Sequence, residues 1–333
     1  MDIKERLRMF LGAEPAARVA QLPTHDFGQL TELRLRAGKP MLIRLAGQEY
    51  NLAQQGKVNA MSPDAYRPTP ADISETIERI SQYSFYAFEP ELCLGYITLP
   101  GGHRVGVSGQ AVIENGVVRA WRHISSINFR IAHAIKGCAD TVLPLLFEKS
   151  QSLSNINATQ MESSRRCIPG RFMHTMIISP PGCGKTTLLR DIVRQISDGT
   201  NERAGLTVGL VDERSEVAGC FKGISQNDIG LRTDVLDGCP KAEGMVMLLR
   251  AMSPDVIAVD ELGSKGDAEA AHAVLTAGVK LLCTAHGNDL DDIKKNPILG
   301  GLITRKIFRR FIILRAIGQC EVLDEGGEVC FKA

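Results

Sequence analysis

The chain has 333 residues, of which 44% are apolar and 23% charged, and its formal net charge is +1. This length favours two domains, and the near-neutral charge gives no global electrostatic footprint for nucleic acid. The nine cysteines are scattered without a C-x-x-C pair, which argues against a zinc site or a disulfide framework and favours reduced thiols in the cytosol. We expect neither a signal peptide, because the first residues are charged, nor a transmembrane segment, because no apolar run approaches about 20 residues.

Residues 1–135 are predicted to form a small α+β domain. Apolar residues at helical spacing predict one amphipathic helix over 1–20. Strands are predicted over 33–36 and 41–45, on either side of a Gly-Lys-Pro turn. The polar, proline-bearing stretch over 51–70 predicts a loop or a frayed edge of the sheet.

A second helix is predicted from Asp72 to about Ser84. Asp72 is the expected N-cap, and Glu75, three residues later, fits a capping box. Apolar alternation and a Pro-Gly-Gly turn then predict strands over 95–99 and 103–112, and a further strand is predicted over 126–131. This first domain is therefore expected to end near residue 135.

Residues 136–171 are predicted to be a connecting helix, over 139–149, followed by a mobile loop rich in Ser, Asn and Gln over 150–171. The remaining residues, 172–333, alternate apolar runs with helical patterns. The predicted strands are 175–179, 207–211, 256–259, 281–284 and 311–314. This alternation predicts an α/β fold with a mainly parallel sheet covered on both faces.

The most informative motif is a glycine-rich turn between a predicted strand and a predicted helix. That order is the context of a phosphate-binding P-loop, in which backbone N–H groups and the helix N-terminus attract an anion. Lys185 is expected to reach the β- and γ-phosphates, and Thr186 to hold Mg²⁺. Ser179 stands where the first glycine is usual. The expected nucleotide-binding residues are Ser179, Pro180, Pro181, Gly182, Cys183, Gly184, Lys185, Thr186 and Thr187.

Two acidic pairs follow apolar strands. After the strand over 256–259, Asp260 is the expected Mg²⁺ ligand and Glu261 the expected general base that orients or deprotonates the attacking water. Asp212 and Glu213 end another strand and offer a second acidic contact to water or metal, although a structural Asp–Arg pair is an equally good interpretation.

His286 closes a further strand and is predicted to sense the γ-phosphate, while a purely structural histidine remains the alternative. Arg232 and Arg250 are the candidates for an arginine that acts in the site of a neighbouring subunit. Arg104 and Arg130 compete with them, and for each arginine alone a surface or ion-paired role is the simpler interpretation.

A basic stretch without acidic residues runs from 294 to 310. It can meet anionic lipid or a protein partner, but a solvated surface is the favoured interpretation. No Asn-Lys-x-Asp guanine-reading motif is present. No residue specifies adenine directly. ATP is therefore expected only because a P-loop protein of this kind is taken to be an ATP-driven motor.

Long stretches of the sequence resemble the stage III sporulation protein AA family of endospore-forming bacteria. They include residues 95–106, 125–130, 177–191, 211–216, 232–239 and 252–261. The resemblance implies a RecA-like P-loop ATPase similar to type II and type IV secretion motors. It also implies an acidic box at Asp212 and Glu213, a Walker-B pair at Asp260 and Glu261, and a histidine box at His286.

The same resemblance implies a Mg·ATP-hydrolysing ring, expected to be a hexamer, in the mother-cell cytoplasm at the inner face of the membrane around the forespore. There it would power a transenvelope channel built with other sporulation proteins. Two alternatives stay open: a RecA-like ATPase acting on nucleic acid, which the charge and the 5% aromatic content disfavour, and an ATP-dependent scaffold without hydrolysis, which the two Walker-B carboxylates disfavour.

Overall fold

The computed structural model describes residues 3–59, 62–82, 92–93, 95–133, 135–148, 171–200 and 203–333. Its chain divides into two compact units, Met1–His133 with Gly219–Lys222, and Ala134–Ala218 with Gly223–Ala333. The loop predicted over 150–171 lies, apart from Arg171, outside the described residues.

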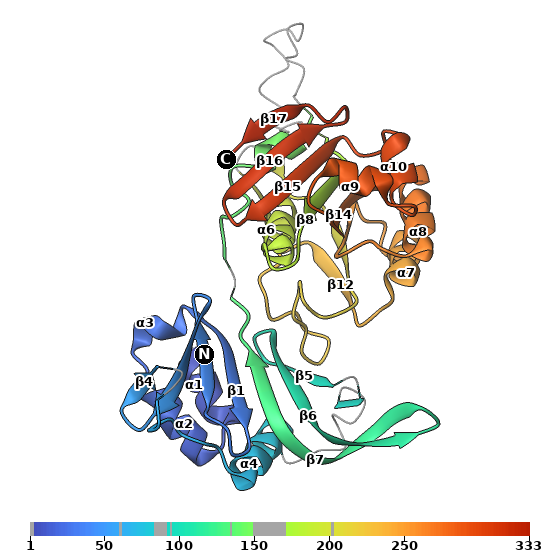
Figure 1. Ribbon diagram of the computed structural model, residues 1–333. Helices are drawn as coiled ribbons and strands as arrows, with labels where there is room; N and C mark the ends of the chain where they lie inside the picture. The colour runs from blue at the N-terminus through green and yellow to red at the C-terminus, as the bar shows by residue number, and fades with distance from the viewer. Residues whose placement is uncertain are drawn as a thin grey trace, which may run out of the picture. The chain divides into compact units, whose positions relative to one another are not determined.

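Among its described residues, the first unit combines helices α1 to α4 with an antiparallel sheet (Figure 1). Its strands follow the order β4-β3-β2-β1-β7-β6-β5. The helices are α1 (Ile3–Phe10), α2 (Ala13–Ala20), α3 (Thr24–Phe27) and α4 (Pro70–Ile80); the strands are β1 (Leu30–Arg36), β2 (Leu42–Leu45), β3 (Gln48–Ala53), β4 (Gly56–Val58), β5 (Tyr96–Leu99), β6 (His103–Glu114) and β7 (Val117–Arg130).

A single apolar core joins these helices to the sheet. Leu33 and Leu35 of β1 are fully buried, and Phe129 of β7 lies beside them in the same cluster as Phe10 of α1 and Ile73 of α4. Fully burying one such side chain contributes about 1.5–3 kcal/mol to folding. Apolar alternation in the strands thus sets which face of the sheet the helices cover.

Three local predictions for this unit were wrong. The single helix over 1–20 is two helices, interrupted at Gly12, where an added Cβ would lie 2.9 Å from the Glu75 carboxylate. The stretch over 51–70, predicted as a loop or a frayed edge, contains regular strand, namely the end of β3 and all of the edge strand β4. The N-cap of α4 is Thr69, whose hydroxyl accepts from the Asp72 amide. Asp72 completes the capping box because its carboxylate accepts from the Thr69 amide, and Pro70 occupies the first helical position.

The second unit is an α/β layer structure. It begins with a short 3₁₀ helix, η2 (Leu143–Leu146), where the sequence predicted an α-helix over 139–149. The other elements are β8 (Thr175–Ser179), α6 (Lys185–Asp198), β9 (Gly199–Thr200), β10 (Arg203–Ala204), β11 (Val208–Asp212), β12 (Thr233–Asp237), α7 (Lys241–Ala251), β13 (Val256–Val259), α8 (Lys265–Thr276), β14 (Lys280–His286), α9 (Leu290–Lys295), α10 (Gly300–Thr304), β15 (Arg310–Ala316), β16 (Gln319–Asp324) and β17 (Val329–Lys332).

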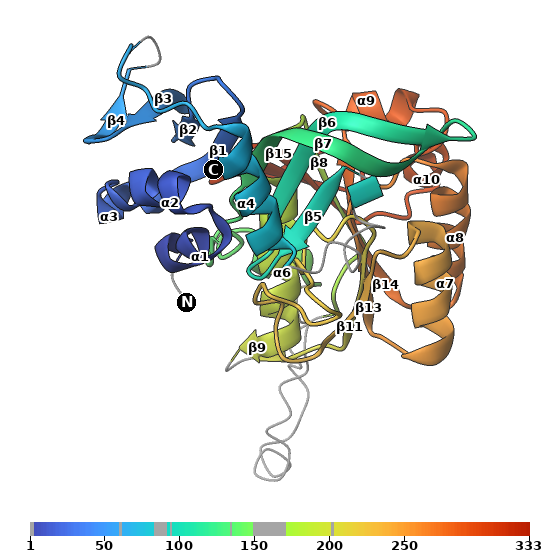
Figure 2. The same ribbon diagram turned by 90° about the horizontal axis from the view of Figure 1, so that it is seen from below.

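The main sheet of this unit has the order β12-β11-β13-β14-β8-β15-β16-β17. The strands from β12 to β15 pair in parallel, and β16 and β17 add an antiparallel edge. Helix α6 covers one face, and α7 and α8 cover the other (Figures 1 and 2). The mainly parallel sheet is as predicted. The strands β12, β16 and β17 were not predicted from the sequence.

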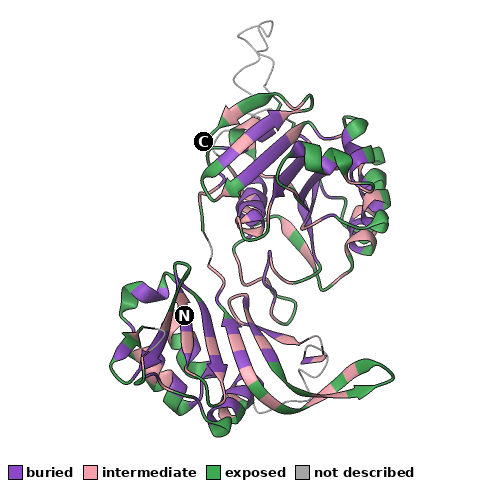
Figure 3. Ribbon diagram, in the orientation of Figure 1, coloured by how far each residue is buried: buried purple, intermediate pink, exposed green. Residues whose placement is uncertain are grey.

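The central strands β8, β13 and β14 are buried on both faces (Figure 3). Parallel strands present their carboxyl ends at the same edge of a sheet, which is where α/β proteins bind their ligands. The strands that end in Ser179, Asp212, Val259 and His286 all pair within this parallel block. The residues that follow them are therefore brought together.

Candidate nucleotide-binding site

The turn between β8 and α6 has the backbone of an anion-binding loop. Gly182 and Gly184 adopt φ values of +79° and +94°, the left-handed region that glycine tolerates best. At Gly184 an added Cβ would lie 2.6 Å from the side chain of Ile317 in the β15–β16 turn, which would have to shift to admit it. Helix α6 begins immediately afterwards at Lys185, and its N-terminus faces this turn.

Lys185 connects the turn to the end of β14. Its Nζ donates to the carbonyl of Ser179 at 3.2 Å and lies 2.8 Å from Nδ1 of His286. The residue is only 8% exposed, and this burial lowers the pKa of its ammonium group, with Glu261 and Asp260 acting in the opposite direction. The cation is therefore fixed at the turn by short polar contacts.

Asp260 lies between two threonine hydroxyls. Thr186 Oγ1 donates to Asp260 Oδ2 at 2.9 Å, and Thr284 Oγ1 donates to Asp260 Oδ1 at 2.6 Å. Thr186 and Asp260 were both predicted site residues, and the structure brings them together. Thr284 was not predicted, because its pairing with Asp260 depends on β14 lying next to β13 in the sheet.

Glu261 points along the same edge toward His286. Its Oε1 lies 2.7 Å from Nε2 of His286, and its Oε2 lies 3.5 Å from the guanidinium of Arg214. A neutral imidazole with its proton on Nε2 satisfies both contacts of the ring, since Nδ1 can then accept from Lys185. Lys185, His286 and Glu261 thus form one polar chain.

Asp212 holds the loop that follows β11 through its carboxylate. It is 1% exposed, and its carboxylate accepts from the backbone amides of Glu216, Val217 and Ala218. Burial raises the pKa of Asp212 to about 6 despite these hydrogen bonds. Hydrogen bonds from backbone amides thus take the place of the Asp–Arg pair that the sequence suggested for Asp212. The next residue, Glu213, forms an ion pair with Lys241.

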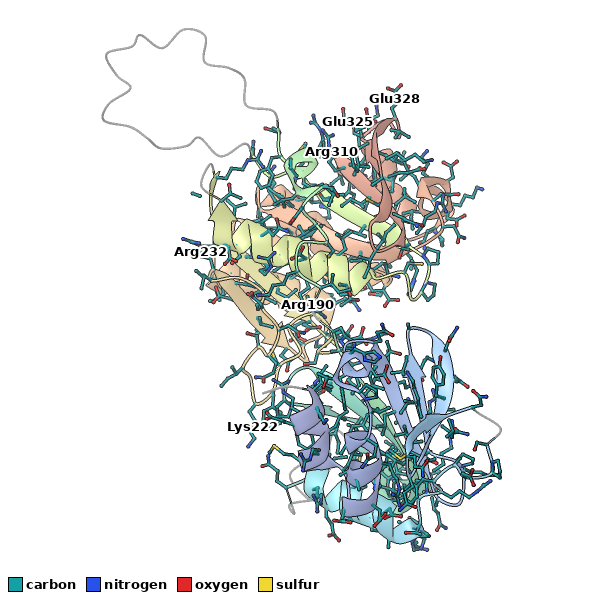
Figure 4. All side chains as sticks on the ribbon, turned by 90° about the vertical axis from the view of Figure 1, so that its left-hand side faces the viewer. Arg190, Lys222, Arg232, Arg310, Glu325 and Glu328 are labelled. Carbon is teal, nitrogen blue, oxygen red and sulfur yellow. The ribbon has the colours of Figure 1, made fainter. Side chains whose placement is uncertain are left out.

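Arg190 holds the same loop from α6. Its guanidinium donates to the carbonyls of Val217 at 2.6 Å and Glu216 at 2.7 Å, and the residue is 8% exposed (Figure 4). Sequence reasoning missed this contact, because the only signal for it is a charged residue in an apolar helical pattern. Asp191 beside it accepts from the Ala139 amide at 2.9 Å, so α6 also anchors the segment that precedes β8.

The comparisons with known proteins give one family for the whole chain. The family model described as "Sporulation stage III, protein AA" matches residues 1–325. The stage III sporulation protein AA of Bacillus subtilis (strain 168) is 38% identical over 315 residues, which covers 93% of this chain and 92% of that protein. The chain belongs to this family. The resemblance seen in the sequence is thereby confirmed.

The solved structures give the fold. The ATPase DotB of Legionella pneumophila matches with a TM-score of 0.54 at 16% identity, over 90% of this chain and 78% of that one. The pilus retraction motor PilT with bound ADP matches with a TM-score of 0.50 at 16% identity, over 94% of this chain and 77% of that one. This member of the family therefore has the P-loop ATPase fold that was predicted.

A cavity of about 360 Å³ opens beside the acidic end of this site. The lining residues are Glu213, Arg214, Lys241, Glu261, Leu262, Gly263, Ser264, Asp267, His286, Asn296 and Leu299. Two predicted site carboxylates, those of Glu213 and Glu261, therefore share one cavity with His286.

The predicted arginines lie away from these contacts. Arg232 donates to the carbonyls of Ser197 and Asp198, so it caps the C-terminal end of α6 (Figure 4). Arg250 is exposed in the last turn of α7. The role of either residue in a neighbouring subunit's site stays a prediction.

The donor set fits a nucleotide with its metal. Mg²⁺ is commonly held by one or two protein oxygens together with phosphate oxygens, and Thr186 Oγ1 and Asp260 Oδ2 lie side by side at the turn.

In the part of the chain that the structure describes, no helix combines the length and apolar character of a membrane span.

Proposed function

We propose that this chain is a Mg·ATP-hydrolysing motor of the secretion-ATPase type. The observation that supports it best is the convergence of Lys185, Thr186, Asp260, Glu261 and His286 at one edge of the parallel sheet. These residues come from three separate segments of the chain. Their side chains supply a phosphate-binding cation, oxygen ligands for a divalent metal and a carboxylate base within one polar network.

Each residue has a definite task in this proposal. The turn over residues 179–187 and the N-terminus of α6 bind the phosphates, with Lys185 on the β- and γ-phosphates. Mg²⁺, held by Thr186 and Asp260, would neutralise charge on the phosphate oxygens. Glu261 orients the attacking water and takes its proton, while His286 links this base to the lysine that contacts the γ-phosphate.

The larger setting is also a proposal. We propose a homo-oligomeric ring, a hexamer, that lies at the inner face of the mother-cell membrane around the forespore and powers a transenvelope channel with other sporulation proteins. Family membership and the fold shared with DotB and PilT support this setting. In it, residues 1–135, 136–171 and 172–333 act as N-terminal domain, connector and ATPase domain. Arg232 or Arg250 completes the neighbouring subunit's site.

The test is ATP hydrolysis by the purified chain with Mg²⁺, with its mass in solution recorded with and without ATP. We expect turnover, and a larger mass with ATP. Binding of ATP with neither turnover nor assembly would favour the scaffold alternative. Salt-dependent binding of single-stranded DNA with stimulated turnover would favour the nucleic-acid alternative.

A further inference from the structure

Thr284 lies in the strand that separates the P-loop strand from the strand of Asp260. β14 pairs with β8 on one side and with β13 on the other. Thr284 is the third residue from the end of β14 and is 0% exposed. Its side chain therefore reaches the site from inside the sheet, where water does not compete for its hydrogen bonds.

The hydroxyl of Thr284 contacts both acidic residues at once. It donates its proton to Asp260 Oδ1 at 2.6 Å, a short distance typical of a hydrogen bond to a carboxylate. It accepts from the backbone amide of Glu261 at 2.8 Å. A hydroxyl has one proton and two lone pairs, so the donated proton is committed to the carboxylate.

The second contact supports an unusual backbone. Glu261 has a φ of +55°, in the left-handed region that non-glycine residues rarely adopt. The amide of the next residue, Leu262, donates to the Thr284 carbonyl at 2.9 Å. Two successive amides of this turn are therefore tied to one residue, and the turn directs the Glu261 carboxylate to His286.

The first contact fixes the metal ligand. Because Thr284 takes Oδ1 of Asp260, the other oxygen faces Thr186 at the P-loop. Removal of the Thr284 hydroxyl would leave Asp260 free to rotate and would leave the Glu261 amide without this partner. Both changes would alter the orientation of the acidic residues. Among the hydrogen bonds of the described residues, the Thr284 hydroxyl contacts neither Lys185 nor the backbone of the phosphate-binding turn.

We propose that Thr284 is a positioning residue that orients both carboxylates of the ATPase site. This inference rests on the proposed function. It assigns one buried hydroxyl to the alignment of the metal ligand, Asp260, and of the base, Glu261.

The test compares Thr284→Val, which keeps the side-chain shape, with Thr284→Ser, which keeps the hydroxyl. Thr175→Val is the matched control, because Thr175 is also fully buried, donates to a backbone carbonyl at 2.8 Å and lies at the other end of β8 from the turn. Thermal unfolding of all three variants shows which of them are folded.

For Thr284→Val we expect kcat to fall 10- to 100-fold while KM for ATP changes less than threefold. We also expect the tightening of ADP binding by Mg²⁺ to shrink several-fold, a readout that needs no turnover. Thr284→Ser should keep kcat and the effect of Mg²⁺ on ADP binding within threefold of the wild type. Thr175→Val should lose stability alone.

Wild-type kcat and a wild-type effect of Mg²⁺ in folded Thr284→Val would overturn this inference and leave the proposed function standing. The same holds if Thr284→Ser is as impaired as a folded Thr284→Val. If the wild-type chain binds ADP but does not hydrolyse ATP, hydrolysis is overturned and the Mg²⁺ effect still decides the role of Thr284. If it binds neither nucleotide, both proposals fall.

Discussion

At the scale of single residues, Cys183 lies inside the turn that is proposed to bind phosphate. It stands between Gly182 and Gly184, and its side chain is half-buried. A bulky group on its sulfur would occupy the space in which backbone N–H groups meet the phosphates. The position is therefore sensitive to modification, although the thiol has no task in the proposed chemistry.

We predict that alkylation of Cys183 blocks nucleotide binding and that bound nucleotide protects the thiol. The measurement is ADP binding before and after treatment with a maleimide, with modification followed by mass spectrometry. Cys183→Ala is the control, because it should bind nucleotide and keep binding it after treatment, whatever happens to exposed thiols such as Cys330. Full binding by a chain completely alkylated at Cys183 would rule this out.

The sequence predicted the residues of the site better than their contacts. Asp260 and Glu261 were found because they directly follow the apolar strand β13, and His286 because it ends β14. Lys185 and Thr186 were found because they begin the helix that follows a glycine-rich turn. Thr284 and Arg190 were missed because their partners come from distant segments. A threonine inside a buried strand and an arginine in a helix have no local pattern that distinguishes these tasks.

At the scale of elements, β6 and β7 are joined by a buried histidine. His103 begins β6, is 5% exposed, and accepts at Nδ1 from the Ala132 amide just after β7 at 3.1 Å. Burial, with smaller contributions from the charges of Arg6 and His133, lowers the pKa of His103 from 6.5 to about 4. The folded unit therefore favours the neutral ring.

This shift predicts a loss of stability in acid. Because the pKa of His103 is lower in the folded state, its contribution is present above about pH 6.5 and is lost as the pH falls toward 4. Between pH 7 and pH 5 the loss amounts to at most about 2 kcal/mol. The measurement is the free energy of unfolding in urea at both pH values.

His103→Asn should reduce that pH dependence, since the amide oxygen can accept from Ala132 without taking a proton. His123→Asn, at an exposed position of β7, is the matched control. An unchanged difference between pH 7 and pH 5 in His103→Asn would show that another group causes the acid sensitivity.

The predictions of elements succeeded where burial is continuous and failed where it is partial. β8 and β13 were predicted with their observed bounds, because both are buried throughout and contain an uninterrupted apolar run. β12 is an edge strand with no buried residue, so its polar side chains give no periodic signal. The C-terminal strand β17 is likewise short and largely exposed, and β4 has three residues of which only Gly56 is buried.

At the scale of the whole molecule, the chain is a sporulation stage III protein AA family member with a P-loop ATPase fold, and the activity that we propose for it is ATP hydrolysis. Family membership and the P-loop ATPase fold come from the match over residues 1–325 and the likeness to DotB and PilT. Hydrolysis is the proposal that depends on Glu261 acting as a base, and ring assembly and the channel are separate proposals. A folded chain with the same geometry and an inert Glu261 would be a scaffold.

The most direct test of this claim is the rate of ATP hydrolysis by Glu261→Gln beside the wild type, with ATP affinity measured on both. The amide keeps the size of the side chain and an oxygen that can accept from His286, so binding should stay within threefold. Loss of a general base should lower kcat by about 100-fold or more. A Glu261→Gln chain that hydrolyses ATP at the wild-type rate would contradict the account.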